Sequence, residues 1–271
     1  MNQKALEEML GQLCKLTEAL SIHQRQLSLK IEEIHSHHVQ LYGHQDRIYD
    51  QIDALFSIHA LINIRHPLPK MRGWPVSPDF VKILTALVLS EKPALIVEAG
   101  SGVSSVIAGY CLEKNGYGAL VSYDHDEKYA GVSADNVTTH GLARMVNVIH
   151  APLKEMRMGG EAFIWYDTAY LQGQEKIDLL VVDGPPGHLQ RMARYPALPV
   201  FFDRLSDRAV VLLDDAARDD EKEIVQRWLK EYPFFEAEYV DTEKGATILR
   251  RIPVSGGAGR RSHSGGTSKG G

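Results

Sequence analysis

The residues whose types and spacing suggest chemistry follow short apolar runs of the chain. Glu98 precedes the glycine turn Gly100-Ser101-Gly102, and the next apolar run ends at Asp124. Glycines at the start of a helix let a ligand approach backbone N–H groups that have no helical partner. An acid about two dozen residues later can accept hydrogen bonds from both hydroxyls of a ribose. These residues together indicate a site for a nucleoside.

Two details distinguish this turn from the dinucleotide-binding fingerprint G-x-G-x-x-G. The third glycine of that fingerprint is Ser105 in this chain. The carboxylate of Glu98 would repel a pyrophosphate, whereas it suits the positively charged amino group of a methionine moiety. His125 directly follows Asp124, and Ala151 follows the third apolar run, where its position alone suggests the wall of an adenine pocket. A nucleoside that carries methionine therefore fits better than NAD.

Three more carboxylates stand at the ends of later apolar runs. Asp183 opens the segment D-G-P-P-G-H, which ends at His188, and the following run closes with Asp214 and Asp215. Ligands of an open α/β sheet bind at the carboxyl ends of its strands, so these side chains are expected to converge. Clustered carboxylates need a cation or a positive substrate, and oxygen ligands favour Mg²⁺, Mn²⁺ or Ca²⁺. The alternative for the last two is a salt bridge to a neighbour such as Arg218.

An alternation of strands and helices must position these residues. We predict strands at 95–98, 119–124, 146–149, 178–183, 209–214, 236–240 and 246–250, after a helix at 80–89 with Ser77 as its cap. Buried apolar strands that alternate with helices form a parallel sheet covered on both faces. Residues 241–245 alone separate the last two strands, which predicts a hairpin and one antiparallel edge strand.

The E-A-G-S-G turn, Asp124, the D-G-P-P-G loop and the L-L-D-D-A strand end together resemble class I S-adenosylmethionine-dependent methyltransferases. More narrowly, the set is similar to a bacterial subfamily with a D-G-P-P-G loop that is followed by the segment R-Y-P-A-L-P at 194–199, and the likeness spans residues 93–250. The resemblance implies an α/β fold with a Rossmann-like, seven-stranded methyltransferase sheet. It also implies S-adenosylmethionine bound at Glu98, Gly100, Gly102 and Asp124.

A second resemblance concerns the metal. O-methyltransferases of catechols and macrolide sugars bind a cation through an acid after strand four and an acidic pair after strand five, which Asp183, Asp214 and Asp215 resemble. The catechol enzymes place a lysine shortly after the first aspartate, where this chain has Pro186, which disfavours a catechol. We therefore expect methyl transfer to a hydroxyl of a small polar or sugar substrate, with a divalent cation as an optional assistant. Asp183 would lie near the reacting group and the cofactor, with His188 as general base.

Two alternatives stay open. One is an NAD-dependent oxidoreductase, against which Ser105 and Glu98 argue. The other is a non-catalytic scaffold that works through the N-terminal region, against which the full set of cofactor acids argues. The aromatic pair Trp165-Tyr166 is expected either to pack in the core or to line the substrate pocket.

The N-terminal region, residues 1–64, has an apolar residue at every seventh position. These residues are Leu6, Leu13, Leu20, Leu27, Ile34, Leu41, Ile48, Leu55 and Ile62. A seven-residue repeat of this length specifies a coiled coil. The second seam position holds several polar residues, which fix register at a loss of stability. We expect a homo-oligomer, with a dimer favoured over a trimer or tetramer.

The rest of the chain divides by composition. A proline-rich linker with the lead-in helix is expected at 65–92, the methyltransferase domain at 93–253, and a disordered glycine- and serine-rich tail at 254–271. A net charge of -5 without a basic stripe argues against nucleic acid, and no apolar run is long enough to span a membrane. Two cysteines and no secretory signal predict a cytoplasmic protein, with a small molecule or glycan as its substrate.

Overall fold

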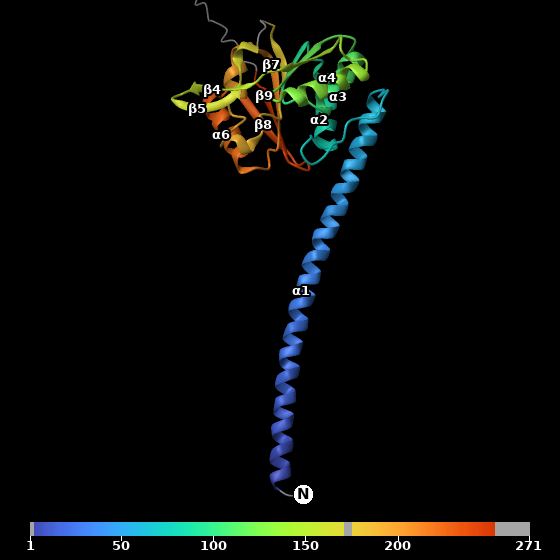
Figure 1. The fold of residues 1–271 in the computed structure, drawn as a ribbon, viewed down its shortest axis with the longest axis vertical. Helices are drawn as coiled ribbons and strands as arrows, with labels where there is room; N and C mark the ends of the chain where they lie inside the picture. The colour runs from blue at the N-terminus through green and yellow to red at the C-terminus, as the bar shows by residue number, and fades with distance from the viewer. Residues whose placement is uncertain (1–2, 171–174, 253–271) are drawn as a thin grey trace, which may run out of the picture. The chain divides into compact units, whose positions relative to one another are not determined.

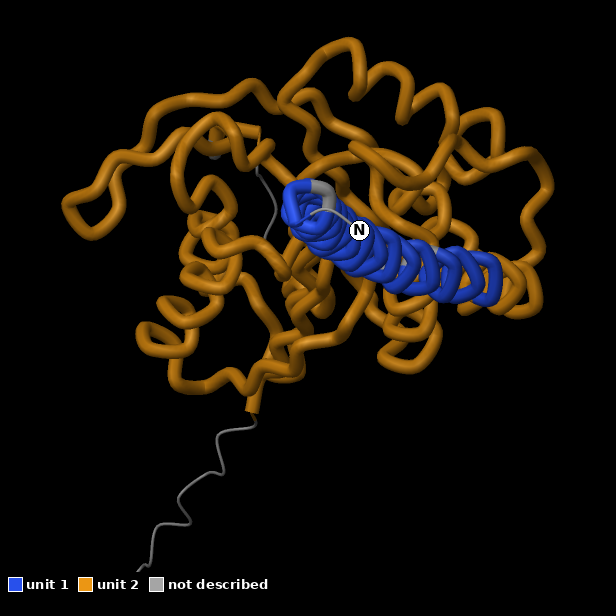
Figure 2. The backbone as a smooth tube through the Cα atoms, turned by 90° about the horizontal axis from the view of Figure 1, so that it is seen from below, with its two compact units in different colours: residues 1–53 blue, residues 54–271 orange. Residues whose placement is uncertain are grey.

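The structure is a computed structural model that describes residues 3–170 and 175–252. Two compact units divide the chain, residues 1–53 and residues 54–271 (Figure 2). The tail expected at 254–271 lies outside the described residues. Within the described ranges, no helix has both the length and the apolar content needed to cross a membrane.

The first unit consists of most of one helix, α1 (Gln3–Leu61), which is 59 residues long. The sequence predicts this helix because the seven-residue repeat runs without a proline to interrupt it. The repeat leaves large apolar side chains exposed, with Leu13, Leu20 and Leu27 showing 54%, 60% and 48% of their surface to solvent. A line of exposed leucines of this length is typical of a helix that pairs with another.

The last two turns of α1 belong to the second unit. Ala54, Ile58 and Ile62 are almost completely buried, and the two isoleucines belong to the hydrophobic core of that unit. We expected the coiled-coil region to end at residue 64. The boundary between the units instead lies between residues 53 and 54, because the end of the helix supplies core side chains.

A seven-stranded sheet with the strand order β3-β2-β1-β6-β7-β9-β8 forms the centre of the second unit (Figure 1). Its strands are β1 (Leu95–Ala99), β2 (Ala119–Asp124), β3 (Val146–His150), β6 (Ile177–Val182), β7 (Leu205–Asp214), β8 (Phe235–Val240) and β9 (Ala246–Arg251). β9 alone runs in the direction opposite to the other six strands, and it lies between β7 and the edge strand β8. The predicted α/β fold, with seven strands and one antiparallel strand at this edge, is confirmed.

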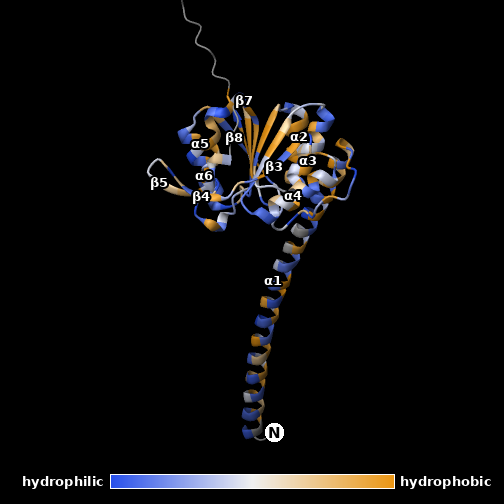
Figure 3. Ribbon diagram, turned by 45° about the horizontal axis from the view of Figure 1, so that its top comes forward, coloured by the Kyte–Doolittle hydropathy of each residue, from blue (hydrophilic) through white to orange (hydrophobic). Residues whose placement is uncertain are grey.

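Helices cover both faces of the sheet. Successive strand residues point to opposite faces, so Leu179 and Val181 of β6 join one core cluster while Leu180 and Val182 join the other. The first cluster includes α2 (Pro78–Glu91), α3 (Val103–Asn115) and α4 (Glu127–Thr139), and the second includes α5 (Ala197–Phe201) and α6 (Asp219–Glu231). The strands are accordingly apolar along most of their length (Figure 3).

A separate hairpin, which the sequence prediction missed, follows β3. It pairs β4 (Leu153–Met158) with β5 (Glu161–Tyr166) in an antiparallel ladder. The turn consists of Gly159 and Gly160, both with positive φ, which is the glycine signal of a two-residue hairpin turn. β5 has an apolar run at 162–166, but β4 carries charged residues between its apolar ones and has no run of the kind by which the other strands were recognised.

Residues at the N-termini of several helices place polar groups near the carboxyl edge of the sheet. The side chain of Asp126 caps α4 by accepting hydrogen bonds from the N–H groups of Lys128 and Tyr129. Three acids, Asp219, Asp220 and Glu221, fill the first turn of α6, where the helix dipole favours negative charge. Ser77 occupies the predicted cap position of α2, but its side chain makes no capping hydrogen bond.

Candidate active site

A cavity of about 860 Å³ opens at the carboxyl edge of the sheet. The loops after β1, β2, β6 and β7 contribute to its wall, together with the start of α6 and the segment around Trp74. This is the place where an open α/β sheet binds its ligands. Eight of the residues predicted for the site line this cavity: Gly100, Ser101, Gly102, Asp124, His125, Asp183, His188 and Asp215.

Asp124, the last residue of β2, is held in a fixed orientation. Its Oδ2 accepts hydrogen bonds from the hydroxyl of Ser101 at 2.6 Å and from the N–H of the same residue at 3.3 Å. Its Oδ1 accepts a bond from the N–H of Asp126 at 3.0 Å. A carboxylate has about four acceptor sites, so Asp124 retains one, on Oδ1, for a hydroxyl donor from the cavity.

The glycine turn after β1 lies against the loop after β6. A Cβ added to Gly100, whose φ is 98°, would lie 3.1 Å from the backbone nitrogen of Gly184. The N–H groups of Asp183 and Gly184 both donate to the carbonyl oxygen of Ala99, at 2.9 and 2.7 Å. The two loops therefore form one continuous floor, and glycine at position 100 permits their close approach.

Glu98 lies beneath this floor and is not part of the cavity wall. It is completely buried and accepts hydrogen bonds from the hydroxyls of Ser105 and Ser122. Burial raises the pKa of Glu98, while the hydrogen bonds from the serines partly offset that effect. Its Oε1 has no hydrogen-bond partner among the described residues. The expected contact of Glu98 with an amino group stays a prediction, and within the described residues its carboxylate supports the turn.

Two further residues expected to bind the cofactor differ in their positions. His125 lies in the cavity wall, and its Nδ1 is 3.6 Å from Asp124. Ala151 is completely buried and is not in the wall. Its N–H donates to the carbonyl oxygen of Asp124 at 2.7 Å, so it fixes the end of β2 through the backbone.

The three aspartates predicted to bind a metal lie together. One carboxylate oxygen from each of Asp183, Asp214 and Asp215 lies within 4.8 Å of the others. Burial and the neighbouring charge of Asp214 raise the pKa of Asp183 well above its ordinary value. Burial and the charge of Asp215 likewise raise the pKa of Asp214. Like charges at this separation require a compensating cation.

That cation is supplied by Arg194, which sequence reasoning missed. Its Nη2 lies 2.6 Å from Asp215 and 3.3 Å from Asp183, and its Nη1 donates to the carbonyl oxygen of Asp214 at 2.8 Å. The residue is only 3% exposed. Burial lowers the pKa of Arg194, but the carboxylates of Asp183 and Asp215 outweigh that effect and raise it. Arg218, the neighbour considered from the sequence, lies 3.0 Å from Asp215.

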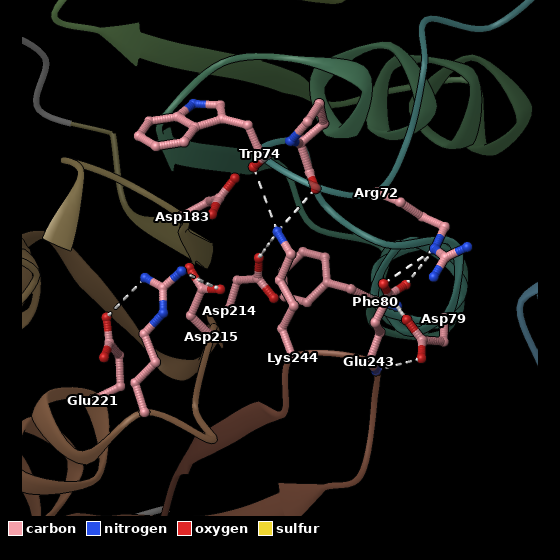
Figure 4. Close-up of polar contacts among 12 residues, drawn as sticks. Arg72, Trp74, Asp79, Phe80, Asp183, Asp214, Asp215, Glu221, Glu243 and Lys244 are labelled. Carbon is pink, nitrogen blue, oxygen red and sulfur yellow. Dashed lines mark hydrogen bonds and ion pairs between the residues drawn. The ribbon is translucent and has the colours of Figure 1, made fainter. Parts of the chain in front are cut away.

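Lys244, in the turn between β8 and β9, connects the cluster to the segment over the cavity. Its Nζ donates to the carbonyl oxygens of Pro75 at 2.9 Å and Trp74 at 3.4 Å, and lies 3.7 Å from Asp214 (Figure 4). The adjacent Glu243 accepts hydrogen bonds from Arg72 at 2.9 and 3.1 Å. The β8–β9 turn therefore fixes the segment that carries Trp74.

Aromatic groups form the other part of the cavity wall. Trp74 is 72% exposed, and its ring lies 6.0 Å from the ring of His188. Tyr166 is buried, and its hydroxyl has no hydrogen-bond partner among the described residues. Of the pair considered from the sequence, Tyr166 lines the cavity whereas Trp165 packs in the core.

Comparison with known proteins identifies the domain. Residues 97–216 match a protein-family model described as a methyltransferase domain. No curated protein matches the chain. Among solved structures, a putative O-methyltransferase from Klebsiella pneumoniae is 17% identical, with 75% of this chain and 90% of that chain covered and a TM-score of 0.51.

Two other structures have the same fold with a ligand bound. The O-methyltransferase from Bacillus cereus in complex with SAH is 16% identical, with 75% of this chain and 90% of that one covered and a TM-score of 0.51. The O-methyltransferase of tomaymycin synthesis from Streptomyces achromogenes, in complex with SAM, is 15% identical, with 75% and 89% covered and a TM-score of 0.51. Residues 97–216 thus match a methyltransferase domain, and the second unit shares the fold of these structures.

Proposed function

We propose that this chain, whose residues 97–216 match a methyltransferase domain, is a class I methyltransferase that transfers a methyl group from S-adenosylmethionine to a hydroxyl of a small polar or sugar substrate. The observation that carries the proposal is the position of Asp124. It stands in the cavity wall, oriented by Ser101, and Oδ1 keeps one acceptor site for a hydroxyl of a ribose. The glycine floor formed by Gly100 and Gly102 would then lie under the methionine part of the cofactor.

The acceptor would bind at the side of the cavity that carries Trp74 and His188. An exposed indole ring offers an apolar face on which a sugar ring can stack. The same wall includes Asp183, Asp215 and Glu221, whose carboxylates accept hydrogen bonds from hydroxyls. This excess of acids disfavours an acceptor with phosphate groups, because like charges repel.

Methyl transfer requires alignment of the acceptor oxygen, the methyl carbon and the sulfur more than activation of the donor. The acceptor oxygen attacks the methyl carbon, the carbon–sulfur bond breaks, and S-adenosylhomocysteine leaves with the bonding electron pair. Holding oxygen, carbon and sulfur in line contributes through proximity and orientation. In this scheme Asp183 orients the acceptor hydroxyl, and His188 takes its proton as general base.

The divalent cation expected at Asp183, Asp214 and Asp215 is not needed in this scheme. Arg194 already lies among these carboxylates and donates to two of them. The donor set of three aspartates suits a hard cation, but the guanidinium occupies the position between them. The chemistry described above therefore uses only the side chains of the protein.

We further propose that α1 joins two copies of the chain in a coiled-coil dimer. The support is the unbroken repeat and the exposure of its leucines, such as Leu20 at 60%. The protein would work in the cytoplasm, where its two cysteines, Cys14 and Cys111, remain unpaired. A nucleic-acid partner is not expected from its charge.

The test of the activity is the release of S-adenosylhomocysteine from S-adenosylmethionine with a panel of acceptors. The panel contains neutral sugars, amino sugars, phosphorylated sugars and a catechol. The proposal predicts turnover with a neutral or amino sugar and at least about tenfold lower rates with the phosphorylated forms. Turnover of NADH-linked substrates instead, or binding of S-adenosylmethionine without any transfer, would favour the oxidoreductase or the scaffold.

A further inference from the structure

The carboxylate cluster of the cavity contains a positive charge that belongs to the chain itself. Arg194 Nη2 lies 2.6 Å from Oδ2 of Asp215, 3.3 Å from Oδ1 of Asp183 and 2.6 Å from the carbonyl oxygen of Asp183. Its Nη1 lies 2.8 Å from the carbonyl oxygen of Asp214 and 3.8 Å from Glu221. One guanidinium thus reaches all three residues that resemble a metal site.

A metal ion and this guanidinium would compete for the same position. Mg²⁺ binds oxygens at about 2.0–2.1 Å and Ca²⁺ at about 2.3–2.6 Å. An ion at such distances from both Asp183 and Asp215 would lie among the atoms that Nη2 contacts. Two positive charges at that separation repel each other strongly in a buried site.

The arginine is also poorly able to leave. It is 3% exposed, and its departure would strip the guanidinium of its carboxylate and carbonyl partners. Breaking a buried ion pair from one side strongly destabilises a protein. Lys244 and Arg218 stand beside the cluster and supply further positive charge, at 3.7 Å from Asp214 and 3.0 Å from Asp215. Three cations of the chain therefore already face the cluster.

We infer that Arg194 is the resident cation of this site and takes the position that a divalent metal would hold. Through its bonds to Asp183 and to the ends of β6 and β7, it positions the cavity wall on the acceptor side. Arg194 is thus a positioning residue. The inference rests on the proposed methyl transfer only in its kinetic part, because metal binding can be measured without any activity.

The test titrates the full-length chain with MnCl₂ and follows free Mn²⁺ by electron paramagnetic resonance. We expect no binding at this cluster tighter than about 1 mM. Asp215→Asn identifies the site, since any binding that persists in that variant comes from elsewhere in the chain. Tight binding to the wild type that Asp215→Asn removes would overturn the inference.

Variants at position 194 test the role of the guanidinium. Arg194→Met should gain Mn²⁺ affinity by at least about tenfold, and its unfolding temperature should rise with Mn²⁺ while that of the wild type does not. Arg194→Lys, which keeps a positive charge, should show neither effect. The control is Arg191→Met, an exposed arginine paired with Glu223, which should behave as the wild type.

Each result of this comparison has a defined meaning. A folded Arg194→Met chain that gains no Mn²⁺ affinity would contradict the inference, because another feature would then exclude the metal. If Arg194→Met does not fold, the comparison of Mn²⁺ binding by the wild type and by Asp215→Asn still tests whether the cluster holds a metal. In the kinetic part, S-adenosylhomocysteine release by the wild type should be unchanged by EDTA. Loss of activity on chelation, restored by Mg²⁺, would overturn the inference while leaving the proposed methyl transfer intact.

Discussion

The hydroxyl of Tyr166 lies directly against Gly184, in the loop that follows β6. A Cβ added to Gly184 would lie 2.3 Å from that hydroxyl oxygen, 3.2 Å from the Cα of Gly100 and 3.3 Å from the carbonyl oxygen of Ala99. Two of these neighbours are backbone atoms, which cannot move without displacing the cavity floor. The glycine at position 184 is therefore required for space.

Gly184→Ala should lower the free energy of unfolding by about 1–3 kcal/mol, because overpacking forces these atoms apart. It should also weaken cofactor binding through the displaced floor. Gly131→Ala is the matched control, since Gly131 lies exposed within α4 with no atom near the added Cβ. That change should stabilise by about 0.5–1 kcal/mol. Chemical denaturation measures the free energy of unfolding of both variants, and equal changes from the wild type would contradict the packing argument.

Lys244→Met tests the connection between the carboxylate cluster and the segment that carries Trp74. The change removes two hydrogen bonds to backbone carbonyls and leaves Asp214, which is completely buried, without its nearby lysine. We expect a loss of about 2–4 kcal/mol in stability. The KM for the acceptor should rise more than the dissociation constant of S-adenosylmethionine. Lys230→Met, at an exposed position of α6, should change neither; a rise confined to the cofactor constant would argue against the connection.

The coiled coil is tested by two pairs of substitutions in the same stretch of α1. Leu20→Lys with Leu27→Lys places charges in the predicted seam and should yield monomers. Ile22→Lys with Leu29→Lys makes the same chemical change at residues that are also exposed, 56% and 61%, but lie outside the seam. Light scattering should find the oligomer intact in the second pair. Monomers in both pairs, or in neither, would contradict the assignment of the seam.

Because His140 is buried, we expect the free energy of unfolding to fall in mild acid. Burial and the neighbouring charge of His66 lower the pKa of His140, which is 2% exposed and lies 2.8 Å from the hydroxyl of Tyr110. The unfolded state then binds more protons than the folded state below about pH 6.5, so stability falls as the pH drops through that value. His140→Gln should flatten this slope, whereas His59→Gln, at an exposed position, should preserve it. Urea denaturation between about pH 5 and 7.5 measures the slopes; parallel curves for all three chains would refute the assignment.

Much of the fold could be predicted because its strands are buried on both faces. Runs such as those ending at Asp124, Asp183 and Asp214 are continuous in apolar residues, and turn residues follow them at once. Their carboxyl ends had to meet at one edge, so the acids of the site could be located. In the hairpin, β4 has no such run, so the signals were the Gly159-Gly160 turn and the apolar run of β5 at 162–166.

The parts of the site that could not be predicted depend on contacts between distant segments. Arg194 follows the D-G-P-P-G loop in a stretch with no strand pattern, and only the folded chain brings it to Asp215. Glu98 was located correctly at the end of β1, but spacing does not reveal that Ser105 and Ser122 hold its carboxylate beneath the glycine turn. Spacing predicts where a residue lies along a strand, whereas its partners depend on tertiary packing.

The most direct test of the account is calorimetry of S-adenosylmethionine binding to the full-length chain, with NAD as the comparison and with or without Mg²⁺. We predict micromolar binding of S-adenosylmethionine that Mg²⁺ does not change, and no binding of NAD. Asp124→Asn should weaken the binding of S-adenosylmethionine by about 30-fold, because a ribose hydroxyl loses its charged acceptor. Asp135→Asn, at an exposed position of α4, should leave it unchanged. Equal affinity of the wild type and Asp124→Asn, or binding of NAD in place of S-adenosylmethionine, would contradict the account.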